Sequence, residues 1–165
     1  MYKVGIITSS DKGAAGQRED KGGPAIKEIT QRFSDDFEVT KYVMLPDEQD
    51  QLAAEMVRMA DEDGIDLIIT TGGTGFSKRD VTPEATLSVI TRRTPGISEA
   101  MRNISFQYTK RAMLSRAESG IRNDTLIVNL PGSPKAIEEI LEPIFPSLKH
   151  GLDMLQGNDS ECARH

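Results

Sequence analysis

The 165-residue chain has little cysteine, histidine and tryptophan, and it contains no apolar run of the roughly 18 residues needed to span a membrane. The single cysteine, Cys162, has no partner for an internal disulfide, which favours a reducing, cytoplasmic setting. The two histidines, His150 and His165, have no serine or carboxylate partner in the sequence pattern. A histidine-based triad and a zinc site are therefore both unsupported.

The chain also has more acidic than basic residues and few aromatic side chains. Its formal net charge is −6, and aromatic residues make up 5% of it. A general nucleic-acid binder normally has a basic face, and single-strand binders stack bases on aromatic rings, so neither class is expected. The length favours one domain over residues 1–156, and the polar tail at 157–165 is expected to be disordered.

Short apolar runs alternate with helical patterns along the chain. Strands are expected at 3–8, 37–45, 66–71 and 124–132. Helices are expected at 48–61 and 98–108, and further helices should begin at Pro24, after an N-cap at Thr82, and at Ser133. A separate final helix is expected to end at about Leu155. Residues 112–116 and 119–122 are expected to form short strands or a hairpin. This alternation predicts an α/β fold, a three-layer sandwich with a mainly parallel sheet flanked by helices.

Four loops follow the expected strands, at residues 9–23, 45–49, 72–80 and 130–135. In open parallel sheets, ligands bind in the crevice outside the carboxyl ends of the strands. Each of these loops carries a combination of glycine, proline, carboxylate and cationic residues. The sequence therefore predicts a ligand site at this edge of the sheet.

The loop at 72–80 has the glycines needed for a phosphate site. Gly72, Gly73 and Gly75 would let backbone N–H groups approach an oxyanion before a helix begins. The plain alternative is a strand-to-helix turn without a ligand. The spacing matches neither the GxGxxG fingerprint nor the P-loop.

Two aspartates accompany this glycine loop. Asp80 and Asp47 could each serve a helix start, Asp80 through the helix dipole and Asp47 as an N-cap. Together, however, two acids in loops at one sheet edge favour Mg²⁺, which is commonly held by one or two carboxylates with water and substrate phosphates. A carboxylate beside a phosphate site is repulsive unless a cation lies between them.

A second anion site is expected at NLPGSPK, where Gly132, Ser133 and Lys135 stand at a helix start. Arg79, Arg116 and Lys135 could neutralise phosphate, although exposed loop cations are often merely solvated. Phosphoryl or nucleotidyl transfer is the chemistry that such a site suits, because it depends on positioning and charge neutralisation.

Three segments, TTGGTGFSKRDVTPEAT, MLSRAESGIR and TLIVNLPGSPKAIEE, resemble the molybdenum-cofactor biosynthesis family. The similarity extends from VGIITSSDKG to LKHGLDML. It implies a homotrimer of the family's fold that adenylylates molybdopterin with Mg-ATP and releases pyrophosphate. It further implies Asp47 and Asp80 as the catalytic, metal-holding acids, and the molybdenum-insertion protein as a partner. The phosphate-binding residues that it implies are Ser9, Asp11, Gly72, Gly73, Thr74, Gly75, Ser115, Arg116, Pro131, Gly132, Ser133 and Lys135.

Three other activities remain open at this point. A paralogue within the family could bind molybdopterin or nucleotide with little catalysis, since the motif residues would be the same. A nucleotide-pyrophosphate hydrolase would turn over its substrate without molybdopterin. A scaffold, as in the gephyrin fusion proteins, would bind without turnover. One departure from the family pattern is Gly22, which stands where serine is common.

Overall fold

The computed structural model describes residues 1–158 and places a six-stranded sheet at the centre of the fold. The strands are β1 (Tyr2–Ser9), β2 (Phe37–Leu45), β3 (Leu67–Thr71), β4 (Arg92–Arg93), β5 (Ser119–Arg122) and β6 (Thr125–Leu130). Their order in the sheet is β2-β1-β3-β6-β5-β4. Strands β2, β1, β3 and β6 are mutually parallel, whereas β5 runs antiparallel to β6 and β4 runs antiparallel to β5. The expected mainly parallel sheet is confirmed.

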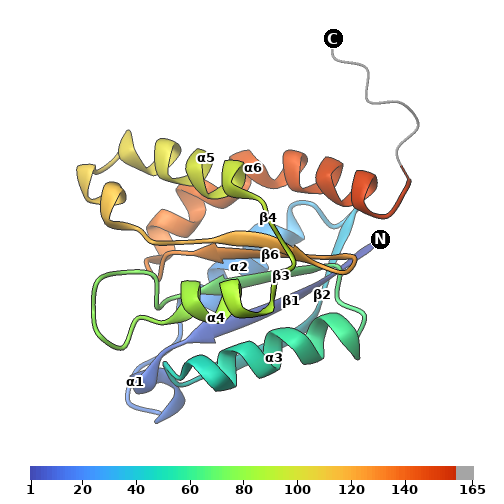
Figure 1. Ribbon diagram of the computed structural model, residues 1–165. Coiled ribbons are helices and arrows are strands. Elements are labelled where there is room, and N and C mark those ends of the chain that lie inside the picture. The colour runs from blue at the N-terminus through green and yellow to red at the C-terminus, as the bar shows by residue number, and fades with distance from the viewer. Residues whose placement is uncertain (159–165) are drawn as a thin grey trace.

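Helices cover both faces of this sheet (Figure 1). They are α1 (Asp11–Ala14), α2 (Gly22–Gln31), α3 (Gln49–Asp61), α4 (Thr82–Val89), α5 (Pro95–Phe106), the 3-10 helix η1 (Lys110–Leu114) and α6 (Pro134–Leu155). Helices α2, α5 and α6 contribute to one hydrophobic core, and α3 and α4 contribute to the other. Within residues 1–158 no helix is long and apolar enough to cross a membrane.

The two cores follow from the alternation of side chains along the strands. In β1, Ile6 packs into the core shared with α2 and α6, whereas its neighbour Ile7 packs into the core shared with α3. The same alternation separates Ile68 from Ile69 in β3. Because both faces are covered, the central strands β1, β3 and β6 are buried almost throughout, as expected for a parallel sheet. The carboxyl ends of β1, β2, β3 and β6 consequently meet at one edge of the sheet.

Helix α6 corrects one expectation. Two separate helices were expected after Ser133, but a single 22-residue helix continues through Pro143 and Pro146. Proline removes a backbone donor and normally breaks a helix. Here a continuous apolar face that includes Leu141, Phe145 and Leu148 is buried against the sheet, and this packing holds the helix together.

Other local expectations also differ from the structure. Helix α2 begins at Gly22, ahead of Pro24, and the preceding loop contains the short α1. Residues 112–116 were expected as a strand or part of a hairpin, but 112–114 lie in η1 and 115–116 follow it, whereas 119–122 form β5 as expected. The tail from residue 159 onward lies outside the described residues, so its expected disorder stays a prediction.

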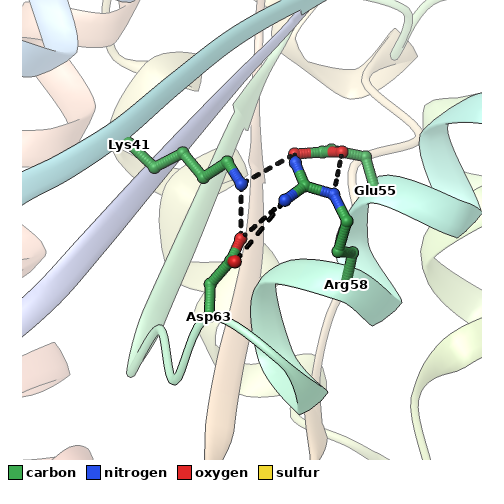
Figure 2. Close-up of polar contacts among 4 residues, drawn as sticks. All are labelled: Lys41, Glu55, Arg58 and Asp63. Atoms are coloured by element: carbon green, nitrogen blue, oxygen red, sulfur yellow. Dashed lines mark hydrogen bonds and ion pairs between the residues drawn. The ribbon is translucent and has the colours of Figure 1, made fainter.

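A charged cluster joins β2 to α3 (Figure 2). Lys41 on β2 forms ion pairs with Asp63 and with Glu55, the latter at 3.8 Å. Arg58 pairs with the same two acids, at 3.1 Å in the case of Asp63. The hydrogen bond from Lys41 is the main reason why the pKa of Asp63 lies below its usual value. The cluster fixes the edge strand β2 against α3. Helix α3 is the helix that follows the loop containing Asp47.

Candidate functional site

Two cavities lie at the carboxyl ends of the strands, and most of the expected site residues line one or the other. The first, here called the polar cavity, has a volume of about 560 Å³ and is lined by Ser9, Asp20, Asp47, Gly72, Asp80 and Gly132, among others. The second, the apolar cavity, has a volume of about 370 Å³ and is lined by Thr74, Gly75, Met101, Ser115, Pro131 and Ile140, among others. The glycine loop contributes to both.

The geometry of the glycine loop requires glycine at two positions. Gly72 has φ +88° and Gly73 has φ +69°, a region that side chains rarely adopt. A Cβ on Gly72 would lie 2.4 Å from the carbonyl oxygen of Ser9, and one on Gly73 would lie 2.4 Å from Oγ1 of Thr82. Backbone conformation and close packing therefore explain why glycine is needed at positions 72 and 73, without any ligand. Their role in phosphate binding stays a prediction.

The start of α4 is fixed to this loop by Thr82. The expected N-cap role of Thr82 is wrong, because Val81 is the N-cap and Thr82 is the first helical residue. The Thr82 hydroxyl donates a 2.9 Å hydrogen bond to the carbonyl of Gly72, and the Thr82 N–H donates to the carbonyl of Gly73. The buried threonine therefore positions the loop instead of capping the helix.

Asp47 is not a helix cap either. Helix α3 has Glu48 as its N-cap, and no side chain caps it. The Asp47 carboxylate accepts hydrogen bonds from the Ser9 hydroxyl at 2.5 Å and from the Asp11 N–H at 3.0 Å. In return, the Asp47 N–H donates to the Asp11 carboxylate at 3.0 Å. These bonds hold the carboxylate at the wall of the polar cavity.

Asp80 reaches the same cavity from the glycine loop. Its Oδ2 accepts a 3.0 Å hydrogen bond from the N–H of Ser77, and no side-chain bond caps α4. Its Oδ1 accepts no hydrogen bond within the part of the chain that the structure describes. Asp80 thus has an oxygen free for a ligand.

The donor set of the polar cavity fits a hard divalent cation. Asp47 and Asp80 supply carboxylate oxygens, the ligand type that Mg²⁺ prefers, and Mg²⁺ commonly keeps several waters. Among residues 1–158, no group of three or more histidine, cysteine or acidic residues is placed to hold a metal. Water and substrate oxygens would therefore have to complete the coordination.

Arg79 is bound to acidic partners. It donates from Nε to Oδ2 of Asp11 and from Nη2 to Oδ1 of Asp11, both at 2.9 Å, and from Nη2 to Glu48 at 2.8 Å. The hydrogen bonds from Arg79 hold the pKa of Asp11 below its usual value, and the same bonds raise the pKa of Arg79. This side chain joins the glycine loop to the loops after β1 and β2.

Arg116 is similarly held. It donates from Nε to the carbonyl of Gly75 and from Nη2 to the carbonyl of Asp80, both at 2.7 Å, and it pairs with Glu84. Both ends of the segment from Gly75 to Asp80 are thereby fixed. The expected role of Arg116 as a phosphate ligand stays a prediction. In the structure, Arg116 holds the loop in shape through these hydrogen bonds.

The remaining expected residues are placed more peripherally. Ser133 caps α6 by accepting a 3.4 Å hydrogen bond from the N–H of Ala136. The Ser115 hydroxyl lines the apolar cavity and accepts a 3.3 Å bond from Ala117. Lys135 lines a neighbouring hollow together with Lys21. Asp11, Arg116 and Ser133 are not among the residues lining either the polar or the apolar cavity.

Sequence reasoning did not single out Asp20, which lines the polar cavity. Its carboxylate accepts hydrogen bonds from the hydroxyls of Thr8 and Tyr42 and from the N–H groups of Gly22 and Gly23. Burial, reinforced by the Asp20 bond, raises the pKa of Tyr42 to about 12. The available signal was an acid directly before the start of a helix, within the expected ligand loop.

The sequence is similar to a known protein family. Residues 5–150 match the family described as a probable molybdopterin binding domain. The chain belongs to this family. Curated relatives include the molybdopterin adenylyltransferase of Helicobacter pylori strain J99, 42% identical over 155 residues, covering 94% of this chain and 88% of the relative. The Escherichia coli K12 molybdopterin adenylyltransferase is 39% identical, covering 98% of this chain and 89% of the relative.

Solved structures of family members share the fold. The molybdopterin biosynthesis enzyme MoaB of Thermus thermophilus superposes with a TM-score of 0.89 at 45% identity, covering 95% of this chain and 98% of that one. MoaB of Pyrococcus furiosus, a tungsten cofactor synthesizing protein, gives 0.85 at 34% identity, covering 94% and 98%. The expected family and three-layer architecture are therefore confirmed.

Proposed function

We propose that the chain adenylylates molybdopterin with Mg-ATP, producing adenylylated molybdopterin and pyrophosphate in molybdenum cofactor biosynthesis. The observation that carries this proposal is the convergence of Asp47 and Asp80 on one cavity beside the glycine loop, in a chain of this family. The relatives named molybdopterin adenylyltransferase support the same reaction.

In this reaction a phosphate oxygen of molybdopterin attacks the α-phosphorus of ATP. A new P–O bond forms, the bond between the α- and β-phosphates breaks, and pyrophosphate leaves. The nucleophile is already ionised at neutral pH, so no general base is needed. Asp47 and Asp80 would hold Mg²⁺, which when bound would neutralise charge between two polyanionic substrates.

The protein's contribution is then mainly positioning. The polar cavity would hold the phosphates, and the loop whose ends Arg116 fixes would keep Asp80 at its wall. The adjoining apolar cavity would take a planar heterocycle against side chains such as Met101 and Ile140. Fixing both reactants in this way lowers the entropic cost of bringing them together.

The decisive experiment measures pyrophosphate release from Mg-ATP with and without molybdopterin. We expect release that requires molybdopterin and that falls by at least about a hundredfold in Asp80→Asn and in Asp47→Asn. Asp35→Asn is the matched control, because Asp35 is an exposed carboxylate between α2 and β2. Release without molybdopterin would indicate a hydrolase. Molybdopterin binding without release would indicate a carrier or scaffold.

We further propose a homotrimer that acts in the cytoplasm and passes its product to a molybdenum-insertion protein. Exposed apolar side chains support an interface: Phe76 is 70% exposed, Tyr108 62% and Met113 64%. Such exposure near a cavity is typical of a contact surface. Sedimentation equilibrium should give a trimer for the wild type, and Met113→Glu should weaken it. A monomer at micromolar concentration would contradict the proposal.

A further inference from the structure

The polar cavity is lined by more acids than cations. Its carboxylates are Glu19, Asp20, Asp47 and Asp80, and its cations are Arg18 and Lys21. A phosphate entering this cavity would be repelled by the acids unless positive charge compensates them. The metal proposed for Asp47 and Asp80 would supply part of that charge. The two cations on the loop between β1 and α2 are the side chains placed to supply more.

The side chains of Arg18 and Lys21 are available to bind a ligand. Within residues 1–158, neither side chain has a hydrogen-bond or ion-pair partner. The two arginines near the glycine loop are engaged: Arg79 with Asp11 and Glu48, and Arg116 with Glu84 and two backbone carbonyls. Among the residues that line the polar cavity, the positive charge available to an incoming anion therefore resides on Arg18 and Lys21.

Within residues 1–158, Asp20 forms no ion pair with either cation, and its carboxylate is engaged by other donors. Both oxygens of Asp20 accept hydrogen bonds, including those from the N–H groups of Gly22 at 3.0 Å and Gly23 at 3.3 Å. Those N–H groups at the start of α2 are consequently taken. Anion binding at this wall would depend on the side chains of Arg18 and Lys21, and not on the helix terminus.

We infer that Arg18 and Lys21 bind the β- and γ-phosphates of the nucleotide, the part that leaves as pyrophosphate. This inference rests on the proposed function. A triphosphate carries more charge than the phosphate monoester of the other substrate, and two unpaired cations beside a divalent metal suit the triphosphate better. Cations at the leaving group also stabilise the charge that develops there as the α–β bond breaks.

The test compares two double variants that remove the same charge. Arg18→Gln with Lys21→Gln removes the two cavity cations, whereas Lys12→Gln with Lys78→Gln removes two exposed cations, on α1 and on the glycine loop, that do not line the cavity. Calorimetric titrations use Mg-ATP, Mg-pyrophosphate, AMP and molybdopterin separately. Thermal unfolding of each variant confirms that the fold is intact, and a Lys21→Arg variant tests rescue of the charge.

The cavity variant should lose about tenfold or more in affinity for Mg-ATP and Mg-pyrophosphate. Its affinities for AMP and molybdopterin should change less than about twofold, and the control variant should lose little toward any ligand. In turnover, KM for Mg-ATP should rise and kcat should fall, with Lys21→Arg near wild type.

Three results would overturn the inference: unchanged Mg-ATP affinity, equal losses in both double variants, or a loss confined to molybdopterin. The last result would assign the cations to the other substrate. The binding measurements do not require turnover. A wild type that binds Mg-ATP but releases no pyrophosphate with molybdopterin would refute the proposed function, while the comparison of variants would still decide the inference.

Discussion

The hydroxyl of Ser9, at the end of β1, donates a 2.5 Å hydrogen bond to Oδ1 of Asp47, which follows β2. The bond joins two loops that are remote in sequence and orients one of the two acids proposed to hold Mg²⁺. Asp47 accepts a second bond from the N–H of Asp11. The carboxylate therefore depends on Ser9 for one of its two described constraints.

Replacing Ser9 should affect metal dependence more than stability. In Ser9→Ala, we expect the Mg²⁺ concentration for half-maximal activity to rise about threefold to tenfold, because Asp47 is less firmly oriented. The free energy of unfolding should fall by only about 1 kcal/mol. Ser10→Ala is the control, since the Ser10 hydroxyl accepts from the N–H of Gly13 and, within residues 1–158, forms no hydrogen bond with Asp47. An equal rise in both variants would refute the positioning role.

Two glycines of the site should respond very differently to alanine. Gly72→Ala places a Cβ at 2.4 Å from a backbone oxygen in a left-handed conformation, and should destabilise the fold by about 2–4 kcal/mol. In Gly132→Ala the nearest atom is 3.6 Å away, an ordinary contact. Urea denaturation should therefore leave Gly132→Ala within about 1 kcal/mol of wild type. Similar losses in both would contradict the loop geometry.

The buried Asn129 on β6 should be important for stability. Its amide nitrogen donates to the hydroxyls of Thr70 at 3.0 Å and Thr86 at 2.9 Å, and its oxygen accepts from the N–H of Glu118 at 3.1 Å. Asn129→Ala leaves these buried groups without their partner, so we expect a loss of about 2–4 kcal/mol in urea denaturation. Asn103→Ala on the exposed face of α5 should change stability by less than about 0.5 kcal/mol.

Tyr42 should make stability depend on pH at the alkaline end. Burial, and then the bond to Asp20, raises its pKa to about 12, whereas an unfolded tyrosine titrates near 10. A raised pKa means that the folded state favours the protonated phenol. This contribution is complete below about pH 10 and is lost as the pH rises toward 12. Unfolding measurements between pH 9 and 12 should show a smaller decline for Tyr42→Phe, and an identical decline would refute the assignment.

The sequence predicted the arrangement of the core elements because their signals are local. Buried strands such as β3 and β6 are short apolar runs, and the helix starting at Ser133 has a cap and a proline. The continuity of α6 through Pro143 was not predictable, because it depends on packing against the sheet. The helical state of residues 112–114 likewise depends on contacts with α5 that no local pattern encodes.

The candidate site was predicted to a similar extent. Strand ends in a parallel sheet meet at one edge, so the convergence of Asp47, Asp80 and Gly72 followed from topology. The partners of each side chain did not follow. Arg79 and Arg116 bind protein acceptors, whereas Arg18 has none within the described part of the chain, and these pairings depend on loop conformations that sequence spacing leaves undetermined.

The polar cavity has walls from β1, β2, β3 and the loop after β6, and β6 is inserted between β3 and β5. A nascent chain cannot form the cavity until β6 has joined the sheet, so ligand binding begins only when folding is nearly complete. A ligand bound there would contact the ends of neighbouring strands and would stabilise the pairings β2–β1, β1–β3 and β3–β6 together. Its binding would raise the melting temperature of the whole sheet and would serve as a reporter of correct assembly.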